Sequence, residues 1–232
     1  MAKKGKRYKD SLASVDLDKS YTLDEAVSQL IDMPKAKFAQ SVEVSVKLGV
    51  DPKKSDQMVR GSCKLPFGTG KERKVLVFCE AEKEQEAKNS GADFVGSQAL
   101  IDKISKGWVE FDCCISTPSM MKNVSRLGKT LGPRGLMPSL KTGSVTDNLS
   151  SAVKDAKGGK LDFKMNKSGA LNTGVGKVSF SKDQIVANIT AFIKGLIQSK
   201  PQSVKGKFIQ SITLSLTMSP GLKVNLPKEL QV

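Results

Sequence analysis

The sequence predicts a mixed fold in which two flanks of α+β character enclose an insert of α/β character. Three observations support this division. The middle of the chain alternates short apolar runs with charged, helix-forming stretches, which is typical of a parallel sheet with crossover helices. The flanks contain segments in which apolar and polar residues alternate, which is typical of half-solvated strands. Most of the basic charge also lies in the flanks.

The insert alternates strands and helices in chain order. Its predicted strands cover residues 74–79, 92–95 and 109–115, and its predicted helices cover residues 81–89, 97–106 and 120–131. Ser97 is of a residue type that caps helices, and Gly132 with Pro133 is expected to end the last helix. Cys113 and Cys114 are adjacent, so they are expected to face opposite sides of the third strand.

The flanks combine long helices with alternating strands. Their predicted helices cover residues 22–33 and 182–198, and their predicted strands cover residues 41–50, 161–165, 171–180 and 208–218. Thr22 and Glu25 have the spacing of a capping box. In the first strand, valines alternate with Glu43, Ser45 and Lys47. One face of this strand is therefore expected to be buried and the other solvated.

The charge of the chain divides in the same way as its periodicity. The formal net charge is +15. Residues 68–158 hold 14 basic and 11 acidic residues, whereas the two flanks together hold 24 basic and 12 acidic residues. A surplus of this size favours a polyanionic partner, because neutralising phosphates releases counterions. Nucleic acid is favoured over a membrane surface, since no basic amphipathic helix stands out, and the flanks are the expected binding domain.

Turn-forming residues mark where the domains meet. Residues 66–70 and residues 157–160 are both rich in such residues. These connectors divide the chain into flanks at residues 1–67 and 159–232 and an insert at residues 68–158, and the residues alone leave open whether the two flanks form one discontinuous domain.

The residue composition excludes several classes of site. The chain contains no histidine, which excludes Ser-His-Asp and Cys-His nucleophilic sites and every metal site that needs histidine. Its four cysteines form no CxxC pair, which suits a reducing cytoplasm, and Cys79 and Cys113 are expected to be buried. The N-terminus has no apolar signal-peptide core, and no run is long enough to span a membrane. No catalytic residue, metal ligand or cofactor is predicted.

Two segments of the insert invite a phosphate-binding interpretation. Gly128-Lys129-Thr130 is similar to the end of a P-loop, but Asn123 stands where that motif needs glycine. The loop at residues 131–138 carries Arg134 at its tip. This loop either places a cation against phosphate or is only a structural turn, and the residues alone do not decide between these roles.

The better candidates for RNA contact lie in the flanks. The segment at residues 211–221 carries Ser and Thr hydroxyls along one face of a strand, and these suit hydrogen bonds to phosphate, ribose and base edges. Met218 is a soft side chain that can pack on a base or ribose. Lys37 and Phe38 combine a cation with an aromatic ring. The alternative interpretation of the strand is an ordinary Thr-rich solvent face.

The stretch from Asp51 to Lys71 is the most specific in the chain. It contains five basic residues, three glycines and two prolines, so its backbone must turn repeatedly, as in a basic connector between domains. Further motifs are KGKRY near the start, AKFAQSVEV, GADFVG, LGPRGLMP, KSG, VGKVSF and Thr217-Met218 before Pro220. Together these motifs resemble the family of large-subunit ribosomal protein number one, the "L-one" stalk protein, over almost the full chain.

The resemblance implies a fold, a function and a set of partners. The fold would be an RNA-binding domain I built from both termini and an inserted, Rossmann-like three-layer α/β domain II. Domain I would bind the stalk region of large-subunit rRNA, and the stalk would help deacylated tRNA leave the exit site. Bacterial members also bind a stalk-like structure in their own mRNA and repress its translation. The protein would act as a monomer within the cytoplasmic ribosome, with no cofactor and no membrane partner.

The resemblance also implies which residues contact RNA. By position, these are Lys37, Phe38, Ser41, Glu43, Lys54, Lys167, Gly169, Ser211, Thr213, Thr217, Met218 and Ser219. Ser219 departs from the family pattern, in which glycine follows Thr-Met and allows close approach of the backbone. Phe67 and Asn172 stand where relatives often have histidine.

Two other functions stay open from the sequence. A general nucleic-acid-binding protein outside the ribosome would share the basic surface but would show little preference for stalk RNA. An enzyme acting on phosphorylated substrates would use Lys129 in the insert, although Asn123 weakens that interpretation.

Overall fold

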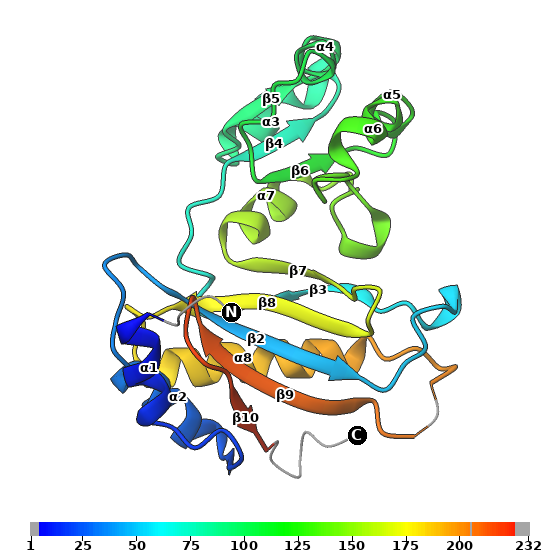
Figure 1. The fold of residues 1–232 in the computed structure, drawn as a ribbon. Helices are drawn as coiled ribbons and strands as arrows, with labels where there is room; N and C mark the ends of the chain where they lie inside the picture. Colours follow the sequence, from blue (N-terminus) through cyan, green and yellow to red (C-terminus); the bar gives the residue numbers. More distant parts are fainter. Residues whose placement is uncertain (1–4, 205, 226–232) are drawn as a thin grey trace. The chain divides into compact units, whose positions relative to one another are not determined.

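The chain folds into two compact units. The computed structural model describes residues 5–204 and 206–225. Unit 1 comprises Met1–Gly70 and Asp162–Val232, and unit 2 comprises Lys71–Leu161 (Figure 1). The boundaries expected from the sequence, after residues 67 and 158, lie three residues before the observed boundaries after Gly70 and Leu161. The positive φ angles of Gly68, Gly70 and Gly159 show why glycines are needed there.

Unit 1 is built on a five-stranded sheet. Its strand order is β1-β10-β9-β2-β8. The strands are β1 (Ser20–Tyr21), β2 (Ser41–Leu48), β8 (Ala170–Lys177), β9 (Ile209–Leu216) and β10 (Leu222–Val224). β2 pairs antiparallel with both β8 and β9, and β1 pairs parallel with β10. A strand from the first flank therefore lies between two strands from the second flank.

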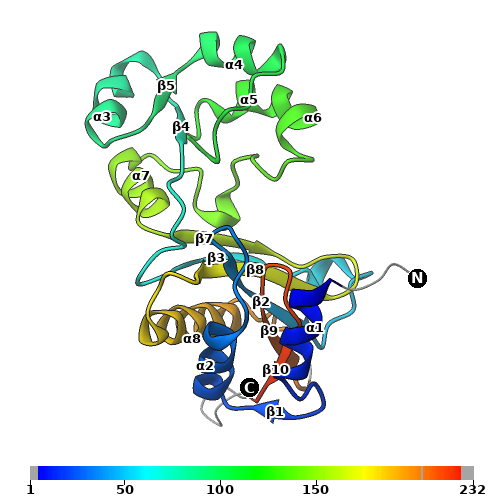
Figure 2. The same ribbon diagram turned by 60° about the vertical axis from the view of Figure 1, so that its left-hand side comes forward.

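Helices cover one face of this sheet. α2 (Leu23–Asp32) and α8 (Lys182–Gln198) lie on this face, and unit 1 also contains α1 (Lys6–Ala13). α8 runs along the sheet and packs on β8 and on α2 (Figures 1 and 2). The buried side chains of β2 are the predicted alternating set, from Val42 to Leu48. Capping boxes begin α2 at Thr22 and α8 at Ser181, because in both the N-cap hydroxyl and the N3 side chain satisfy backbone amides.

The stretch from Asp51 to Lys71 is more than a connector. It contains the short 3-10 helix η1 (Ser55–Gln57) and the strand β3 (Arg60–Lys64), which pairs with β7 (Lys160–Lys164) in a separate two-stranded sheet. β3 packs closely on α8. A Cβ atom at Gly195 would lie 2.7 Å from the Cβ atom of Cys63, so glycine is needed for this approach.

Unit 2 has a three-stranded parallel sheet between helical layers. Its order is β5 (Phe94–Gly96), β4 (Val75–Phe78) and β6 (Cys113–Ser116). The helices are η2 (Ala81–Lys83), α3 (Glu84–Asn89), α4 (Gln98–Ser105), α5 (Met121–Val124), η3 (Ser125–Leu127), α6 (Gly128–Leu131), η4 (Leu140–Thr142) and α7 (Leu149–Lys157). One apolar core joins the sheet to α4, α5 and α6, and the other joins it to α3 and α7. The parallel α/β prediction is confirmed.

Several sequence-based details of unit 2 are wrong. Ser97 stands at the start of α4, but its side chain makes no capping hydrogen bond. The third strand begins only at Cys113, because Asp112 accepts a hydrogen bond from the Lys74 N–H and ends the preceding loop. Cys114 and Cys113 do face opposite cores, although Cys113 is only half-buried. The predicted helix at residues 120–131 is divided by a 3-10 segment.

A buried asparagine fixes the connector that leaves unit 1. Asn188 on α8 is fully buried. Its Oδ1 atom accepts from the Phe67 N–H at 3.1 Å, and its Nδ2 atom donates to the carbonyls of Gly68 and Val175 at 2.9 and 2.8 Å. One side chain therefore joins the connector, α8 and β8.

Replacing Asn188 is expected to destabilise unit 1. Asn188→Ala leaves three backbone groups without partners and should lower the free energy of unfolding by about 3 kcal/mol. Urea unfolding measures this change. Asn172→Ala removes an exposed asparagine and is the control, with a change within about 0.5 kcal/mol. A loss below about 1 kcal/mol for Asn188→Ala would contradict the anchoring role.

An ion pair between Asp93 and Lys157 should make the stability of unit 2 fall as the pH falls. The Val75 N–H donates to the Asp93 carboxylate at 2.8 Å, and Lys157 lies 3.1 Å from it. The hydrogen bond from Val75 and then the Lys157 charge lower the pKa of Asp93. The stabilisation is present above the unfolded-state pKa, near 4, and is lost as the pH falls through the folded-state pKa. Wild-type and Asp93→Asn proteins should differ in Tm at pH 7, and the difference should shrink as the pH falls below about 4. A difference that stays constant as the pH falls would contradict this.

Candidate nucleic-acid interface

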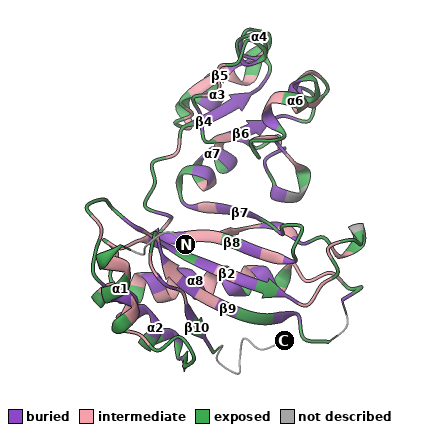
Figure 3. Ribbon diagram, viewed as in Figure 1, coloured by how far each residue is buried: buried purple, intermediate pink, exposed green. Residues whose placement is uncertain are grey.

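The second face of the unit 1 sheet is polar. Buried residues alternate with exposed or half-buried ones along β2, and along β9 from Ser211 to Leu216 (Figure 3). Glu43 lies opposite Ser215, Ser45 lies opposite Thr213, and Lys47 lies opposite Ser211. On the other side of β2, these positions face Gly174, Asn172 and Ala170 of β8. Small and hydroxyl-bearing residues therefore make a flat surface to which a large ligand can come close.

The structure brings Ser41 and Thr217 together at the beginning of β2. The Ser41 N–H donates to the Thr217 Oγ1 atom at 3.1 Å, and the Thr217 N–H donates to the Ser41 carbonyl at 3.1 Å. Thr217 Oγ1 also lies 3.4 Å from that carbonyl. The Thr217 hydroxyl therefore holds the end of β9 against β2, which positions the residues that follow it.

Met218 has a strained backbone and an exposed side chain. It is the only non-glycine residue with positive φ among the described residues, at 63°, and its side chain is 68% exposed. This conformation costs an L-residue about 1–2 kcal/mol. The surrounding turn must stabilise it, and the strain presents an apolar thioether to solvent. Such outliers concentrate at binding sites.

Ser219 is part of the turn that holds Met218. Its Oγ atom accepts from the Leu216 N–H at 2.8 Å and lies 3.0 Å from the Leu216 carbonyl. Its own N–H donates to the same carbonyl at 3.0 Å. The Ser219 hydroxyl is therefore occupied within the protein, and the residue keeps negative φ, since Met218 carries the positive one.

A neighbouring loop presents Lys37 and Phe38. Both are exposed, with Phe38 at 50%. The buried Gln40 ties this loop to the Met218 turn, because its amide donates to the Thr217 carbonyl at 2.7 Å and accepts from the Ala36 N–H at 2.9 Å. An exposed ring and an exposed cation thus lie beside the Thr217–Ser219 segment.

The opposite end of β2 holds a second group of predicted residues. The loop between β7 and β8 carries Lys167, which is exposed, and Gly169, which is buried with φ 73°. The Asn166 Oδ1 atom accepts hydrogen bonds from Ser168 and from the Ala170 N–H, which closes the loop. The Gly169 carbonyl accepts from the Leu48 N–H at 3.0 Å. Gly169 thus shapes the loop that displays Lys167.

Lys54 and Ser211 lie toward this same end. Ser211 is exposed and faces Lys47 in the register of β9 with β2. Lys54 is exposed in the turn that follows β2, where its N–H donates to the Asp51 carbonyl at 3.2 Å. The eight residues of β2 span about 25 Å at 3.3 Å per residue, so the predicted residues form two groups joined by a polar sheet face. Two separated groups of cations and adaptable side chains suit an extended polyanion.

Other kinds of site are not evident in the part of the chain that the structure describes. No group of three or more potential metal ligands gathers within residues 5–204 and 206–225. Within the same ranges, no helix combines the length and the apolar character needed to cross a membrane. Gly128, Lys129 and Thr130 lie within α6 and not in a phosphate-binding loop.

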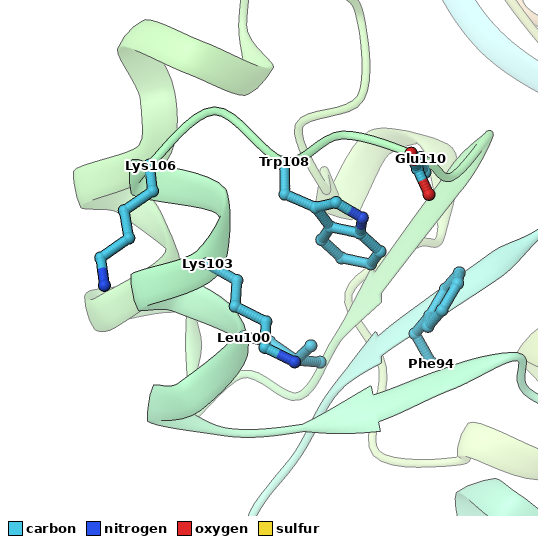
Figure 4. A pocket seen from close by; sticks show the side chains of 6 residues that line it. All are labelled: Phe94, Leu100, Lys103, Lys106, Trp108 and Glu110. Atoms are coloured by element: carbon cyan, nitrogen blue, oxygen red, sulfur yellow. The ribbon is translucent and has the colours of Figure 1, made fainter.

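Unit 2 has a pocket of about 490 Å³ that opens to solvent (Figure 4). It is lined by Phe94, Leu100, Lys103, Lys106, Trp108 and Glu110. Phe94 and Trp108 pack edge to face, with ring centroids 4.9 Å apart. The rim carries charges of both signs, and none of the residues predicted from the sequence lines it. The sheet face of unit 1 is therefore the better candidate site.

Comparison with known proteins gives the same identification over the full chain. The sequence model of the Ribosomal protein L1p/L10e family matches residues 30–220. The large ribosomal subunit protein uL1 of Chlamydia caviae is 49% identical over 225 residues, which cover 97% of each chain. The uL1 protein of Kosmotoga olearia is 48% identical over 228 residues, covering 98% of this chain and 99% of its own. This chain belongs to the ribosomal protein L1p/L10e family.

Membership of the L1p/L10e family confirms the resemblance predicted from the sequence. The family consists of ribosomal proteins that are structural and not enzymatic, so the interpretation of the insert as an enzyme is closed. The family also gives the cellular location, which is the ribosome in the cytoplasm.

Sequence reasoning missed several residues that position the site. Arg7 on α1 donates to the Met218 carbonyl at 2.9 Å and to the Pro34 carbonyl at 3.4 Å. Gln40 and Asn166 fix the two loops, and Lys47 donates to the Ser168 carbonyl. No local sequence signal marks the contacts of Arg7 with Met218, Gln40 with Thr217 and Lys47 with Ser168, because these partners lie more than 100 residues apart. The contacts of Asn166 are local, since they join it to Ser168 and Ala170.

Removing Arg7 is expected to loosen the Met218 turn. A hydrogen bond from a charged donor is worth about 1.5–3 kcal/mol, so Arg7→Ala should speed amide exchange at Thr217 and Ser219, whose N–H groups donate to the Ser41 and Leu216 carbonyls, about tenfold or more. Hydrogen exchange measures this directly, with the amides of β2 as an internal reference. Lys9→Ala, on the same helix, is the matched control. Unchanged exchange at both amides in Arg7→Ala would show that the turn holds itself.

Proposed function

We propose that this chain is a structural component of the large ribosomal subunit and binds the stalk region of large-subunit rRNA through the sheet face and loops of unit 1. In this function, the stalk helps deacylated tRNA leave the exit site. The same surface binds a stalk-like structure in the chain's own mRNA and represses its translation. The protein acts as a monomer within the ribosome.

The conformation of Met218 is the single observation that carries this proposal. An exposed methionine held at positive φ costs stability, and its 68% exposure shows that the protein buries little of its side chain in return. Contact with a base or ribose would give the exposed thioether a packing partner. The neighbouring Lys37 and Phe38 add a cation and a ring, and the flat polar sheet admits a nucleic-acid backbone.

Each type of residue would then have its own task. Lys37, Lys54 and Lys167 are exposed cations that would neutralise phosphates. Ser211 and Thr213 would offer hydroxyls from β9, which lies beside β2. Glu43 also lies on this face and is exposed. As an acceptor only, it would bind a base amino group or a 2′-OH and would repel a phosphate placed directly above it.

Replacing Met218 tests the site. Met218→Ala is expected to weaken binding of stalk RNA by about 1–3 kcal/mol, because the backbone strain remains while the packing contact is lost. Met218→Leu keeps apolar bulk at the same position and is the matched control, with a smaller loss. Filter binding or calorimetry measures both. Affinity equal to wild type in Met218→Ala would move the site elsewhere.

Replacing Lys54 tests a phosphate contact. Lys54→Ala should reduce the slope of log K against log salt by about one unit and should weaken all RNAs by similar factors. Titrations of stalk RNA at several salt concentrations give the slope. Lys9→Ala removes an exposed lysine on α1 and should leave the slope unchanged. An unchanged slope in Lys54→Ala would remove this residue from the contact.

Binding to the chain's own mRNA can be tested with the same variant. A reporter placed behind the leader of the chain's own mRNA should be repressed by the wild-type protein and much less by Met218→Ala, since one surface is proposed to bind both RNAs. Repression that is equal for both proteins would separate the mRNA site from the rRNA site.

A general nucleic-acid-binding protein is the remaining alternative. It would bind stalk RNA and an unrelated duplex of equal length with similar affinity, because only the charge surplus would act. The proposed function requires a large preference for stalk RNA.

A further inference from the structure

One long segment of unit 2 contains basic residues but no acidic residue. Residues 113–146 contain Lys122, Arg126, Lys129, Arg134 and Lys141 and no Asp or Glu. The rest of unit 2, residues 71–112 and 147–161, holds 10 basic and 11 acidic residues. The positive charge of the unit therefore comes from this segment alone.

Three of these cations lie on one side of a helical run. Lys122, Arg126 and Lys129 follow the spacing i, i+4, i+7 across α5, η3 and α6, and all three are exposed. Val124, Leu127 and Leu131 face the opposite way and are buried in the core. The three cations thus form a row about 10 Å long at 1.5 Å per residue.

Arg134 is a fourth cation, just beyond the end of α6. It is exposed in the turn that follows, where Gly135 has φ 71°. The α5 and α6 labels in Figures 1 and 2 mark the run, at the edge of unit 2. We call Lys122, Arg126, Lys129 and Arg134 the basic helix face.

No described residue neutralises the basic helix face. The ion pairs found among the described residues of unit 2 lie elsewhere, at Lys83–Asp147, Lys88–Glu84 and Lys157–Asp93. Like charges at i, i+4 destabilise a helix by about 0.2–0.5 kcal/mol. The run is also intrinsically weak, because Gly128 lies inside it and its hydrogen bonding changes to the 3-10 type at η3. The fold therefore keeps a local cost that only an external anion would relieve.

We propose that the basic helix face binds the phosphodiester backbone of RNA, as a second contact separate from the interface of unit 1. The face carries cations and no exposed aromatic ring, which fits backbone contact and not base stacking. Because the chain belongs to a ribosomal protein family, RNA is an available polyanion for this surface. The strand is either a further part of the stalk RNA or a second RNA such as deacylated tRNA.

The test compares two full-length triple variants of equal charge. K122Q/R126Q/K129Q removes three cations from the basic helix face. K103Q/K106Q/K154Q removes three exposed lysines elsewhere in unit 2 and is the matched control. In the first arm, stalk RNA is titrated over a salt series. In the second arm, deacylated tRNA is titrated onto the preformed complex of protein and stalk RNA, which separates the two sources of backbone.

The expected result is a change of slope in one arm. K122Q/R126Q/K129Q should make log K against log salt shallower by about 2–3 units, at 0.7–0.9 unit for each lost phosphate contact, and the control should leave it unchanged. The charge-retaining variant K122R/R126K/K129R should keep the wild-type slope, which excludes loss of folding as the cause. The arm that responds identifies the RNA.

Three results would overturn the proposal: no change of slope in either arm, an equal change in the control, or competition by polyglutamate as strong as that by RNA, which would indicate an acidic protein partner. Failure of the proposed function is a separate outcome. It would show as a wild-type protein with no preference for stalk RNA, whether or not the basic helix face contributes to the slope.

Discussion

The pairing of β2 with β8 and β9 is the constraint on which the rest of unit 1 depends. β2 belongs to the segment before unit 2, whereas both of its partners come after it. The alternating valines of β2 supply the central row of the core beneath the sheet. Because side chains alternate with a period of two, the same register that buries the valines turns the polar residues outward. The strand pairing that buries the core therefore also exposes the polar interface.

Hydrogen bonds between polar groups of the interface itself determine the shape of the turn that carries Met218. The Thr217 hydroxyl bonds to the Ser41 backbone at the beginning of β2, and the Ser219 hydroxyl bonds to the Leu216 backbone at the end of β9. Gln40 and Arg7 hold the same turn from other segments. These bonds hold Met218 in a conformation that it would not adopt alone. Recognition would then rest on a preorganised turn, which lowers the entropy lost on binding.

Sequence periodicity predicted most helices and strands at the places where the local sequence preference agrees with the packing of the folded chain. The capping box at Thr22 and the full length of α8 were predicted, because caps and apolar faces are local signals. The divided helix at residues 121–131 was not, since Gly128 weakens it and core packing decides its course. Ser97 shows the same limit, because its backbone conformation turns the hydroxyl away from the capping role.

The sequence by itself determined the charge division, the parallel α/β character of unit 2, the family and the candidate residues, because these follow from composition, periodicity and motifs. Only the tertiary structure decided which candidates display side chains and which shape the backbone. In the folded chain Gly169 is buried, and the Ser219 hydroxyl is used in a hydrogen bond with the Leu216 N–H. Folding also brings the cations of the basic helix face to one side of the helical run. The physical reason is distance along the chain: Arg7 and Met218 are 211 residues apart, and no local pattern encodes such a contact.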